Sequence, residues 1–446
     1  MLKPDYFYGK TDKLVEMYQD LENWIISDIA TRLIKSGELS GTSDRELWKL
    51  QQMGLHNTEI VKRISEMSGK SRNEVRRLLR DSVMTSFSDD KEVLTQISAS
   101  DIISPLKNNM AILAMNAELI KTSGELDNLT KTTINQTQKD LLNMLNEVDY
   151  RVASGMQSYS SAVCEVLDRY AESGVMVEYP TGTKRSLEAA VRCCVVTSMN
   201  QTAAQVTNIY IAQNKIEYVL VSAHPGARYD KKNPTGISSH DHWQGKAYKI
   251  IGSEPGFPNL LESTGYTIDP KTGTGTVVNL LGLHGYNCRH SHGPWRKDMV
   301  NKYLDENGNV NINADESQKL YDLQQKQRLL EREIRKTKRE IMTKKQELDM
   351  IAETDVKEIL QPQYDKLTYK LRMQNKRLQL FCKNNDLQLQ GDRTKVSGFN
   401  KKQSAIANGR ATAYKNKIKK KWYNENGIIC YYNNVLTIHT WLSTFL

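Results

Sequence analysis

Apolar residues recur at helical spacing through the first part of the chain. Leu14, Leu21 and Ile25 belong to a series of apolar positions separated by three or four residues. This spacing places them along one face of an amphipathic helix, because an α-helix completes a turn about every 3.6 residues. We therefore expect residues 1–100 to be helical.

Within that region, residues 44–53 and 58–67 each predict a short helix, with a glycine-containing turn between them. Ser71 and Glu74 have the spacing of a capping box, in which a hydroxyl and a carboxylate satisfy free amides at the start of a helix. A short helix, a turn and the basic segment that follows also suit a DNA-binding helix-turn-helix. Two helices that pack on one another, with the arginines in solvent, explain the same residues.

Two more apolar stripes predict helices between residues 105 and 175. The first includes Met110, Leu113, Leu119 and Ile120, and the second covers residues 141–148. Both have the spacing of a buried helix face. We interpret their methionines as adaptable core side chains, since an unbranched thioether fills irregular gaps.

The pattern changes in the next segment. Residues 175–185 alternate apolar and polar side chains around a Pro-Thr-Gly triplet, which predicts a β-hairpin. Residues 186–213 predict a long helix, and its adjacent Cys193 and Cys194 lie among apolar neighbours, as buried free thiols do. Residues 216–224 are rich in β-branched side chains and predict a strand.

Helical spacing returns from residue 314 to about residue 386. Leu330 and Ile334 belong to a heptad-like seam with polar gaps, Pro362 is expected to end the first helix, and Tyr364 starts a second seam. Because two apolar seams need each other, an antiparallel helical hairpin is the favoured interpretation. A dimeric coiled coil is the alternative.

The composition extends this picture to an elongated molecule. Of 446 residues, 39% are hydrophobic and 26% are charged, which is a little poor in core-forming side chains. The length suggests about two to four domains. We therefore expect a mainly α, elongated fold with thin cores. It would have a helical N-terminal half, a C-terminal helical hairpin and, between them, a small loop-rich α/β module rich in histidine and cysteine.

Cysteine use and the lack of long apolar runs indicate where the protein is made. The chain has six cysteines without regular spacing or a C-x-x-C motif, which favours a reducing compartment over a disulfide framework. Its N-terminus shows no apolar core of a signal peptide, and no run of about 18 apolar residues predicts a membrane span. We expect synthesis in the cytosol and no membrane partner.

The net charge of +10 favours polyanionic partners. The positive excess is densest in residues 392–425, where five lysines precede Trp422 and Tyr423. They are Lys415, Lys417, Lys419, Lys420 and Lys421. Lysines that follow phosphates, with aromatic side chains nearby, suit nonspecific contact with DNA. A solvated tail explains the same composition.

The candidate chemistry is concentrated in residues 221–295. Imidazole and thiolate are the ligands that zinc prefers, and a structural site needs four of them. This stretch has few apolar residues, so a metal would supply order that burial cannot. Six of the eight histidines and one cysteine lie here. The candidate zinc ligands are His240, His242, Cys288 and His290, with His224, His284 or His292 as alternatives for the fourth position.

Two other interpretations use the same stretch. With Asp230 or Asp241 as a carboxylate, a histidine-bound metal would suit a hydrolase or nuclease, and Cys288 beside a histidine would suit a nucleophile. No H-E-x-x-H or comparable catalytic spacing supports this. In the other interpretation the histidines only form hydrogen bonds in a module with a small aromatic core. That core would contain Trp243, Tyr248, Tyr286 and Trp295.

Three segments of this stretch resemble a known family. They are HPGAR at 224–228, HDHWQGKAY at 240–248 and GYNCRHSHGPW at 285–295. In this order and separation they resemble the phage minor capsid protein 2 family, which is related to head morphogenesis proteins of the Mu gpF type. The Mu-type module carries two cysteine/histidine clusters, and the HDH and NCRH segments fall in comparable places. This chain has histidines where those relatives often have further cysteines.

The resemblance implies a structural, non-enzymatic minor protein of a phage or prophage head. Such proteins associate with the portal protein and other head proteins during assembly in the host cytoplasm, and they remain in the virion in few copies. The basic tail then has packaged DNA as its expected contact. A metal-dependent nuclease or toxin module carried on a phage protein is the alternative.

The patterns together divide the chain into five parts. They are a helical region at 1–100, a helical core region at 101–215, the His/Cys-rich module at 216–300, a helical hairpin at 314–390 and a basic tail at 391–446.

Overall fold

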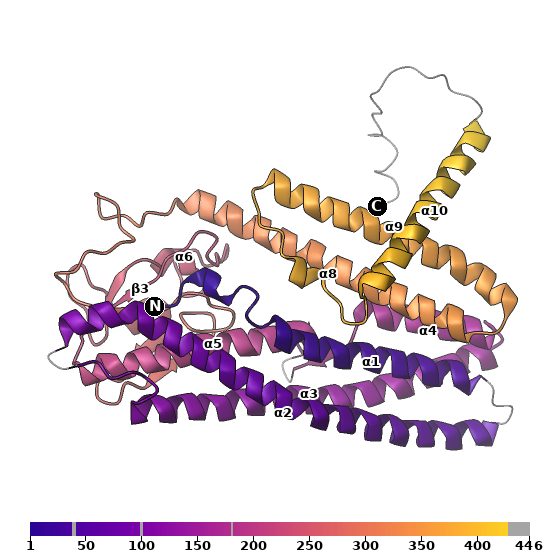
Figure 1. The fold of residues 1–446 in the computed structure, drawn as a ribbon, viewed down its shortest axis with the longest axis horizontal. Coiled ribbons are helices and arrows are strands. Elements are labelled where there is room, and N and C mark those ends of the chain that lie inside the picture. The colour runs from indigo at the N-terminus through magenta and orange to yellow at the C-terminus, as the bar shows by residue number, and fades with distance from the viewer. Residues whose placement is uncertain (38–41, 99–100, 180–181, 427–446) are drawn as a thin grey trace.

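Long helices form an elongated body in the computed structural model of the chain (Figure 1). The structure describes residues 1–37, 42–98, 101–179 and 182–426, apart from the side chains of residues 42–46 and 419–426. The body begins with the 3-10 helix η1 (Pro4–Phe7) and continues with α1 (Asp12–Ser36), α2 (Thr42–Ile97) and α3 (Asn109–Ala153). At about 1.5 Å per residue, α2 is about 84 Å long. The predicted mainly α, elongated fold is confirmed.

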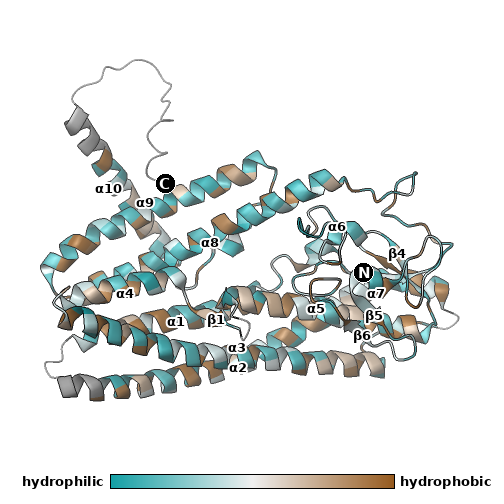
Figure 2. Cartoon of the chain, turned by 180° about the vertical axis from the view of Figure 1, so that it is seen from behind, coloured by the Kyte–Doolittle hydropathy of each residue, from teal (hydrophilic) through white to brown (hydrophobic). Residues whose placement is uncertain are grey.

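The core of the body runs along its length as two neighbouring clusters. Around Leu14, side chains from α1, α2 and α3 meet α5 (Leu187–Gln213). Around Ile25 and Leu145, side chains from α1 and α3 meet α4 (Tyr159–Ser173). Figure 2 shows hydrophobic and hydrophilic residues alternating along these helices. α1, α3 and α4 therefore each bury one face, as the sequence pattern predicts.

α2 is one continuous helix, so the prediction of separate short helices at 44–53 and 58–67 is wrong. Gly54 lies inside α2 with no atom within 4 Å of an added Cβ. A glycine there costs the helix about 1 kcal/mol relative to alanine. The neighbouring His56 and Ile60 are fully buried, and burial of this face outweighs that cost.

The expected capping box also lies inside α2. Glu74 accepts hydrogen bonds from Lys13 of α1 (3.1 Å) and from Arg77 (2.6 Å) instead of capping a helix start. Because the described part of α2 contains no turn here, the helix-turn-helix alternative is wrong as well.

α3 buries only part of the predicted stripe at its start, with Leu119 as the buried leucine of that stripe. Leu119 and Leu126 are buried, whereas Leu113 and Ile120 are 68% and 65% exposed. The helix turns positions 119 and 126 toward the body, so positions 113 and 120 fall on a flank in contact with solvent. The second stripe, at 141–148, packs into the core as predicted.

α5 packs against α1, α2 and α3, and most of its residues are buried. The predicted hairpin precedes it, with β1 (Met176–Glu178) antiparallel to β2 (Lys184–Ser186). Cys193 is buried, Cys194 is half-buried, and both thiols are free. These two cysteines are therefore core side chains, as the sequence predicts.

A three-stranded antiparallel sheet organises the His/Cys module, by which we mean residues 216–300. β3 (Tyr218–Val221) lies between β4 (Ala247–Lys249) and β7 (His292–Trp295). The predicted strand is thus confirmed, and it is the central one. Its side chains alternate, with Val219 on the face toward the helices and its neighbours on the other face.

Short elements connect these strands. α6 (His240–Trp243) precedes β4, while α7 (Leu260–Thr264) leads into the ribbon of β5 (Tyr266–Ile268) and β6 (Gly275–Val277). Much of the rest of the module is loop, as expected. The module sits at one end of the body, against α5 and the far end of α2 (Figure 1).

α8 (Ala314–Met350) and α9 (Thr354–Asn384) form the predicted helical hairpin. Ile334 and Leu371 lie in the apolar cluster between them. The chain turns in the three residues between these helices, so the prediction of a break at Pro362 is wrong, and Pro362 lies inside α9.

The hairpin is fastened to the body, which explains where it turns. Ile351, in the turn, is buried against Cys164 of α4 and Leu360 of α9. Lys344 of α8 forms an ion pair with Asp168 of α4 (2.6 Å). These contacts hold the turn at the residues between α8 and α9, ahead of Pro362 in the sequence.

The last described elements are η2 (Gly391–Thr394) and α10 (Lys401–Asn426). α10 contacts α9, with Ala407 and Ala411 buried, and its far end projects from the body (Figure 1). In the described part of the chain, no helix has both the length and the apolar character needed to cross a bilayer. The division of the chain into five parts stays a prediction.

Candidate metal centre

The fold brings three of the predicted zinc ligands together. His240 begins α6, while Cys288 and His290 lie in the loop before β7. His240 Nδ1 and His290 Nδ1 are 3.3 Å apart, and Cys288 Sγ lies 3.9 Å and 3.8 Å from them. All three side chains are buried. Two segments about fifty residues apart in the sequence therefore converge on one point.

The metal triangle, by which we mean His240 Nδ1, His290 Nδ1 and Cys288 Sγ, has the dimensions of a zinc site. Bonds of about 2.0–2.1 Å to nitrogen and about 2.3 Å to sulfur, at tetrahedral angles, separate two nitrogens by about 3.3 Å and nitrogen from sulfur by about 3.6 Å. The observed separations are 3.3, 3.8 and 3.9 Å. An ion between these three atoms would need only small shifts of the thiol.

The neighbours of the two imidazoles fix which nitrogens carry protons. His240 Nε2 donates to the backbone carbonyl of Leu281 (2.7 Å). His290 Nε2 donates to Gln244 Oε1 (3.0 Å), and that same oxygen accepts the backbone N–H of His224. Because both acceptors are oxygens without protons, both Nδ1 atoms carry lone pairs. Two lone pairs that face each other repel, and a cation between them removes the repulsion.

The electrostatics of the triangle also suit a metal. Burial lowers the pKa of His240 to about 3 and lowers the pKa of His290 well below its usual value, so both imidazoles are neutral at neutral pH. Burial raises the pKa of Cys288, so without a metal its thiol keeps its proton. Neutral imidazole is the form that binds zinc, and zinc binding displaces a thiol proton.

The candidates for a fourth ligand differ in their distance from the three converging side chains. His224 is the nearest, because its ring stacks on His290 with the ring centroids 4.5 Å apart. His242 is exposed and lies outside the group of candidate ligands that the described residues form, so the structure does not bring it to the triangle. Two residues apart in a helical turn, His240 and His242 point in nearly opposite directions, which explains the difference.

His284 and His292 belong to a second polar cluster, not to the triangle. His284 Nε2 lies 2.7 Å from His292 Nδ1, and the pair is enclosed by Asn200 and Asn208 of α5. Asn208 extends the cluster by donating a hydrogen bond from its amide to the Tyr266 hydroxyl (2.7 Å). His284 holds φ at +58°, a conformation that residues other than glycine rarely adopt. The cluster therefore holds the module against α5.

The sequence did not reveal these partners on α5. Asn200 also donates to the backbone carbonyls of Cys288 and His290, both at 2.9 Å. An asparagine in a helix rich in apolar residues does predict hydrogen-bond partners, since a buried amide needs them. The sequence does not show which distant loop supplies those partners.

The family-like motifs have structural explanations. Trp243 donates to the carbonyl of Ile237 (2.9 Å), and Lys246 donates to the carbonyl of His242 (2.8 Å). Gly226 adopts φ +70° beside α8, where an added Cβ would stand 3.1 Å from Gln324. These residues shape the loops around the triangle.

The residues proposed for catalysis lie elsewhere. Asp230 accepts hydrogen bonds from Ser238 and from the backbone of Lys232. Asp241 accepts from Gln318 of α8. Neither belongs to the group of candidate metal ligands that the described residues form. The buried Cys288 has a raised pKa, the opposite of an activated nucleophile.

The expected aromatic core is present except for one member. Trp243 and Tyr248 are 1% exposed and Trp295 is buried, whereas Tyr286 is 44% exposed, so its assignment to the core is wrong. Of the basic residues predicted to contact DNA, Lys415 and Lys417 are exposed on α10. The side chains of Lys419, Lys420 and Lys421 lie outside the described residues.

Comparison with known proteins identifies the family. The family model described as Phage minor capsid protein 2 matches residues 2–378, from the N-terminus to the last turns of α9. The chain belongs to the phage minor capsid protein 2 family. No curated protein and no solved structure matches it.

Membership makes this minor capsid protein a structural component of the phage virion, with other head proteins as its partners. The matched span contains the body, the His/Cys module and most of the helical hairpin. It ends before η2 and α10, so the basic helix lies outside the part of the chain that the family shares.

Proposed function

We propose that this minor capsid protein is a non-enzymatic part of the phage head that binds the portal protein during assembly. The helical body makes the contact, and the His/Cys module is a rigid element fastened by one zinc ion. The observation that carries the proposal is the family match over residues 2–378. Capsid proteins work through lasting contacts between surfaces, so an exposed apolar surface on the body is the feature to look for.

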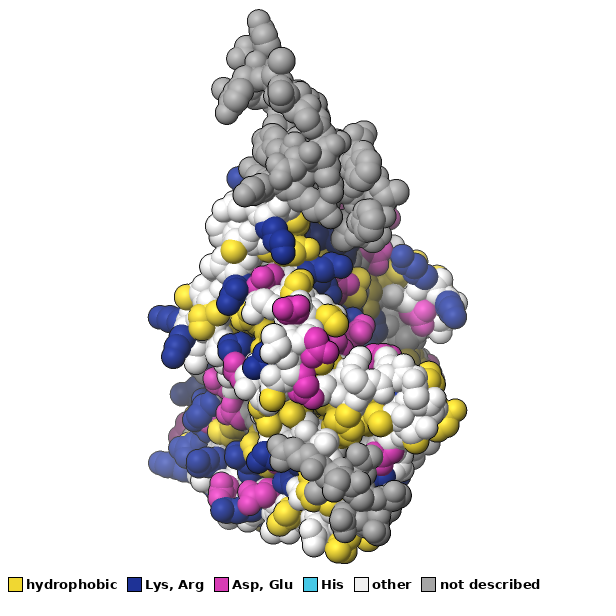
Figure 3. Space-filling model, turned by 90° about the vertical axis from the view of Figure 1, so that its right-hand side faces the viewer, with side chains coloured by type: hydrophobic (Ala, Val, Ile, Leu, Met, Phe, Trp, Pro, Cys, Tyr) yellow, Lys and Arg dark blue, Asp and Glu magenta, His cyan; other side chains and the backbone are white. Residues whose placement is uncertain are grey.

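The first half of α2 supplies such a surface. Leu47, Leu50 and Val61 are 60%, 68% and 49% exposed. At about 100° per residue they lie within about 60° of one another around the helix, together with Gly54. Figure 3 faces the end of the molecule where α2 begins and shows hydrophobic side chains among charged ones there. A helical stripe of this kind suits packing against helices of a partner.

Charge substitutions in this stripe test the contact. The full chain carrying Leu47→Asp and Leu50→Asp should lose at least about tenfold in affinity for the co-encoded portal protein, since each buried leucine contributes about 1.5–3 kcal/mol. Val300→Asp is the matched control, because Val300 is 91% exposed on the module, far along the chain from α2. Pull-down of the portal by both variants and the wild type alike would remove α2 from the proposal. No association of the wild type with any head protein would refute it.

The zinc belongs to the same proposal. His240, Cys288 and His290 would hold the ion, and His224 is the nearest side chain for the fourth position. A bound zinc ion would supply fixed bonds between two loops that share few apolar contacts. A structural ion is favoured over a nuclease centre because Asp230 and Asp241 make their hydrogen bonds elsewhere.

Contact with packaged DNA is assigned to α10. Lys415 and Lys417 are exposed on α10, and the far end of this helix projects from the body (Figure 1). Replacing the five tail lysines by glutamine should weaken binding to duplex DNA and lower the slope of its salt dependence by about 0.9 for each phosphate that the tail no longer neutralises. Glutamine at Lys366 and Lys376, exposed on α9, is the control. Equal salt dependence in the tail variant and the wild type would remove DNA from the proposal.

A further inference from the structure

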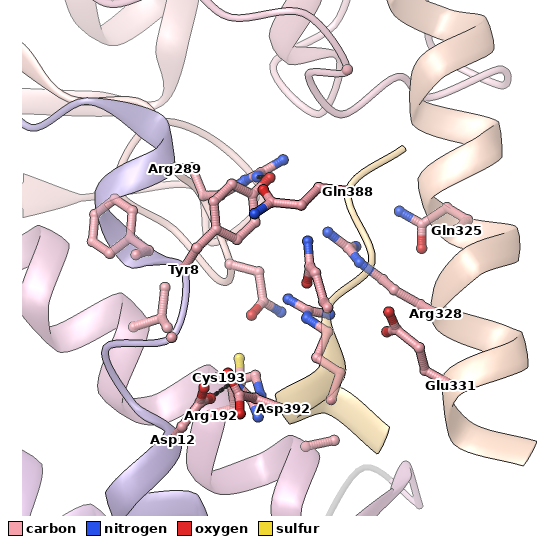
Figure 4. Close-up of a pocket in the computed structure, with 18 of the residues that line it drawn as sticks. Tyr8, Asp12, Arg192, Cys193, Arg289, Gln325, Arg328, Glu331, Gln388 and Asp392 are labelled. Carbon is pink, nitrogen blue, oxygen red and sulfur yellow. Dashed lines mark hydrogen bonds and ion pairs between the residues drawn. The ribbon is translucent and has the colours of Figure 1, made fainter. Parts of the chain in front are cut away.

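A cavity of about 640 Å³ lies beside the metal triangle and is not explained by it. Five parts of the chain form its walls: the start of α1 with η1, the first turns of α5, the loops of the module, α8, and the segment around η2 (Figure 4). His224, His240 and His290 lie on one side of it. The volume is in the range of ligand sites in proteins.

The charged groups of this cavity are mostly arginines. Seven arginines line it, against four carboxylates from Asp12, Glu188, Glu331 and Asp392. The arginines are Arg192, Arg228, Arg289, Arg328, Arg332, Arg335 and Arg393. The excess of positive charge is therefore three (seven minus four). Among the described residues no lysine lines the cavity, although lysines outnumber arginines in the chain.

Several of these arginines have partners within the protein. Arg192 pairs with Asp12 (2.9 Å), and Arg335 pairs with Glu188 (2.8 Å). Arg289 donates to the hydroxyl of Tyr8. These contacts use two of the four carboxylates, and their arginines are structural.

Arg328 and Arg393 are different. Both are half-buried, and within the described part of the chain neither guanidinium group makes a hydrogen bond or an ion pair. Asp392, beside them in sequence, pairs with Lys395 instead. Glu331 faces the same space, yet its buried Oε1 has no hydrogen-bond partner. The guanidinium donors of Arg328 and Arg393 therefore line the cavity without acceptors among the described residues and can bind an anion that enters it.

Burial and neighbouring positive charges lower the pKa of both arginines. Burial and the nearby charges of Arg393 and Arg289 lower the pKa of Arg328 to about 10. Burial and Arg192 lower the pKa of Arg393 as well. Both guanidinium groups stay protonated at neutral pH, and an anion between them would raise their pKa values again and give their donors acceptors.

We infer that this cavity binds a phosphate group, held between Arg328 and Arg393. Phosphate fits better than a carboxylate for two reasons. An excess of three positive charges suits an anion with more than one negative charge, and planar guanidinium forks match the oxygens of phosphate in pairs. A free nucleotide and a phosphate of a nucleic-acid strand share this chemistry. The site is separate from α10 and does not depend on the portal contact.

Thermal stability and binding measurements on the full chain test this assignment. Phosphate, thymidine monophosphate and trinucleotides with and without a 5′-phosphate are titrated at constant ionic strength. The wild type should bind these probes and melt at a higher temperature in phosphate. Arg328→Gln with Arg393→Gln should weaken binding by at least about tenfold, because a charge-assisted hydrogen bond to phosphate is lost at each position.

Stability without ligand separates a binding role from a structural one. If the two arginines serve to bind an anion, the double variant removes a repulsion that no bound anion offsets. Its melting temperature in phosphate-free buffer should therefore equal that of the wild type or exceed it. Lys326→Gln, an exposed change of the same charge on α8, is the control and should affect neither measurement. Unchanged binding in the double variant, or a wild type that no probe stabilises, would overturn the inference.

The probes also identify the source of the phosphate. Preference for the 5′-phosphorylated trinucleotide over the unphosphorylated one indicates a strand end, equal affinity for both indicates the strand backbone, and binding of the mononucleotide alone indicates a free nucleotide. Cleavage of a trinucleotide that Cys288→Ser abolishes would refute the non-enzymatic role proposed above and leave the phosphate site intact. The phosphate site and the non-enzymatic role are therefore refuted by different experimental results.

Discussion

Replacing Asn200 by alanine should loosen the His/Cys module from α5. Asn200 is 1% exposed and makes three polar contacts with the loop that carries the triangle. Its amide donates to the carbonyls of Cys288 and His290, both at 2.9 Å, and its oxygen lies 3.2 Å from His284 Nδ1. Alanine would leave the Cys288 carbonyl and one ring nitrogen without a partner, and would leave the His290 carbonyl only a long contact from the Cys288 thiol (3.9 Å).

The size of the effect follows from those three groups. A buried polar group left without a partner costs about 1–3 kcal/mol, so three cost about 3–6 kcal/mol when water enters part of the vacated space. Every 1.4 kcal/mol is about a factor of ten in an equilibrium. Amide hydrogens of residues 288–292 that exchange through local opening should therefore exchange at least about 100 times faster in the variant.

Hydrogen–deuterium exchange measured by mass spectrometry on the full chain is the assay. Gln201→Ala is the control, because Gln201 is half-buried and donates one hydrogen bond to the same loop, to the carbonyl of His284 (2.9 Å). It should accelerate exchange less than about tenfold. If Asn200→Ala and Gln201→Ala change the exchange of residues 288–292 equally, the buried cluster does not fasten the module.

Three further predictions concern the body and the hairpin. Burial raises the pKa of Glu347 from 4.5 to about 7, which means that the folded state favours the protonated carboxyl. The contribution of this carboxyl to the stability of the fold is therefore complete below pH 4.5 and is lost as the pH rises through 7. Glu347→Gln should therefore flatten the decline in melting temperature between pH 5 and 8, and an identical decline in both proteins would contradict this. Ile334→Ala, at a fully buried position between α8 and α9, should cost about 2–5 kcal/mol in urea unfolding; a loss below about 1 kcal/mol would mean that the hairpin is not packed as described. Gly54→Ala should stabilise α2 by up to about 1 kcal/mol, because an added Cβ meets no atom within 4 Å, whereas a destabilised variant would indicate a break in the helix there.

Much of the helical fold was predictable because burial and helical spacing agree over long segments. The seam of α8 at Leu330 and Ile334 packs against α9 as its spacing predicts. Local signals failed where distant contacts outweighed them. Gly54 does not end α2, and Pro362 does not end the first helix of the hairpin. In both places the buried contacts are with other helices. The local sequence pattern does not identify such distant partners.

The candidate site shows the same division. Residue type and clustering were enough to select His240, Cys288 and His290, which the structure brings together. They were not enough to separate His242 from His240, because that depends on the direction in which one helical turn faces the core. The cavity at Arg328 could not be foreseen at all, since five segments distant in sequence build its walls.

The central claim is that an assembly module of the phage head is fastened by one metal ion. Metal analysis and X-ray absorption of the purified full chain test it most directly. About one zinc per chain is expected, with one sulfur at about 2.3 Å and at least two nitrogens at about 2.0–2.1 Å. Cys288→Ser should lose most of the zinc, whereas His242→Ala should keep it. A wild-type protein that is metal-free, with residues 221–295 as resistant to protease as in zinc-supplemented protein, would contradict the account.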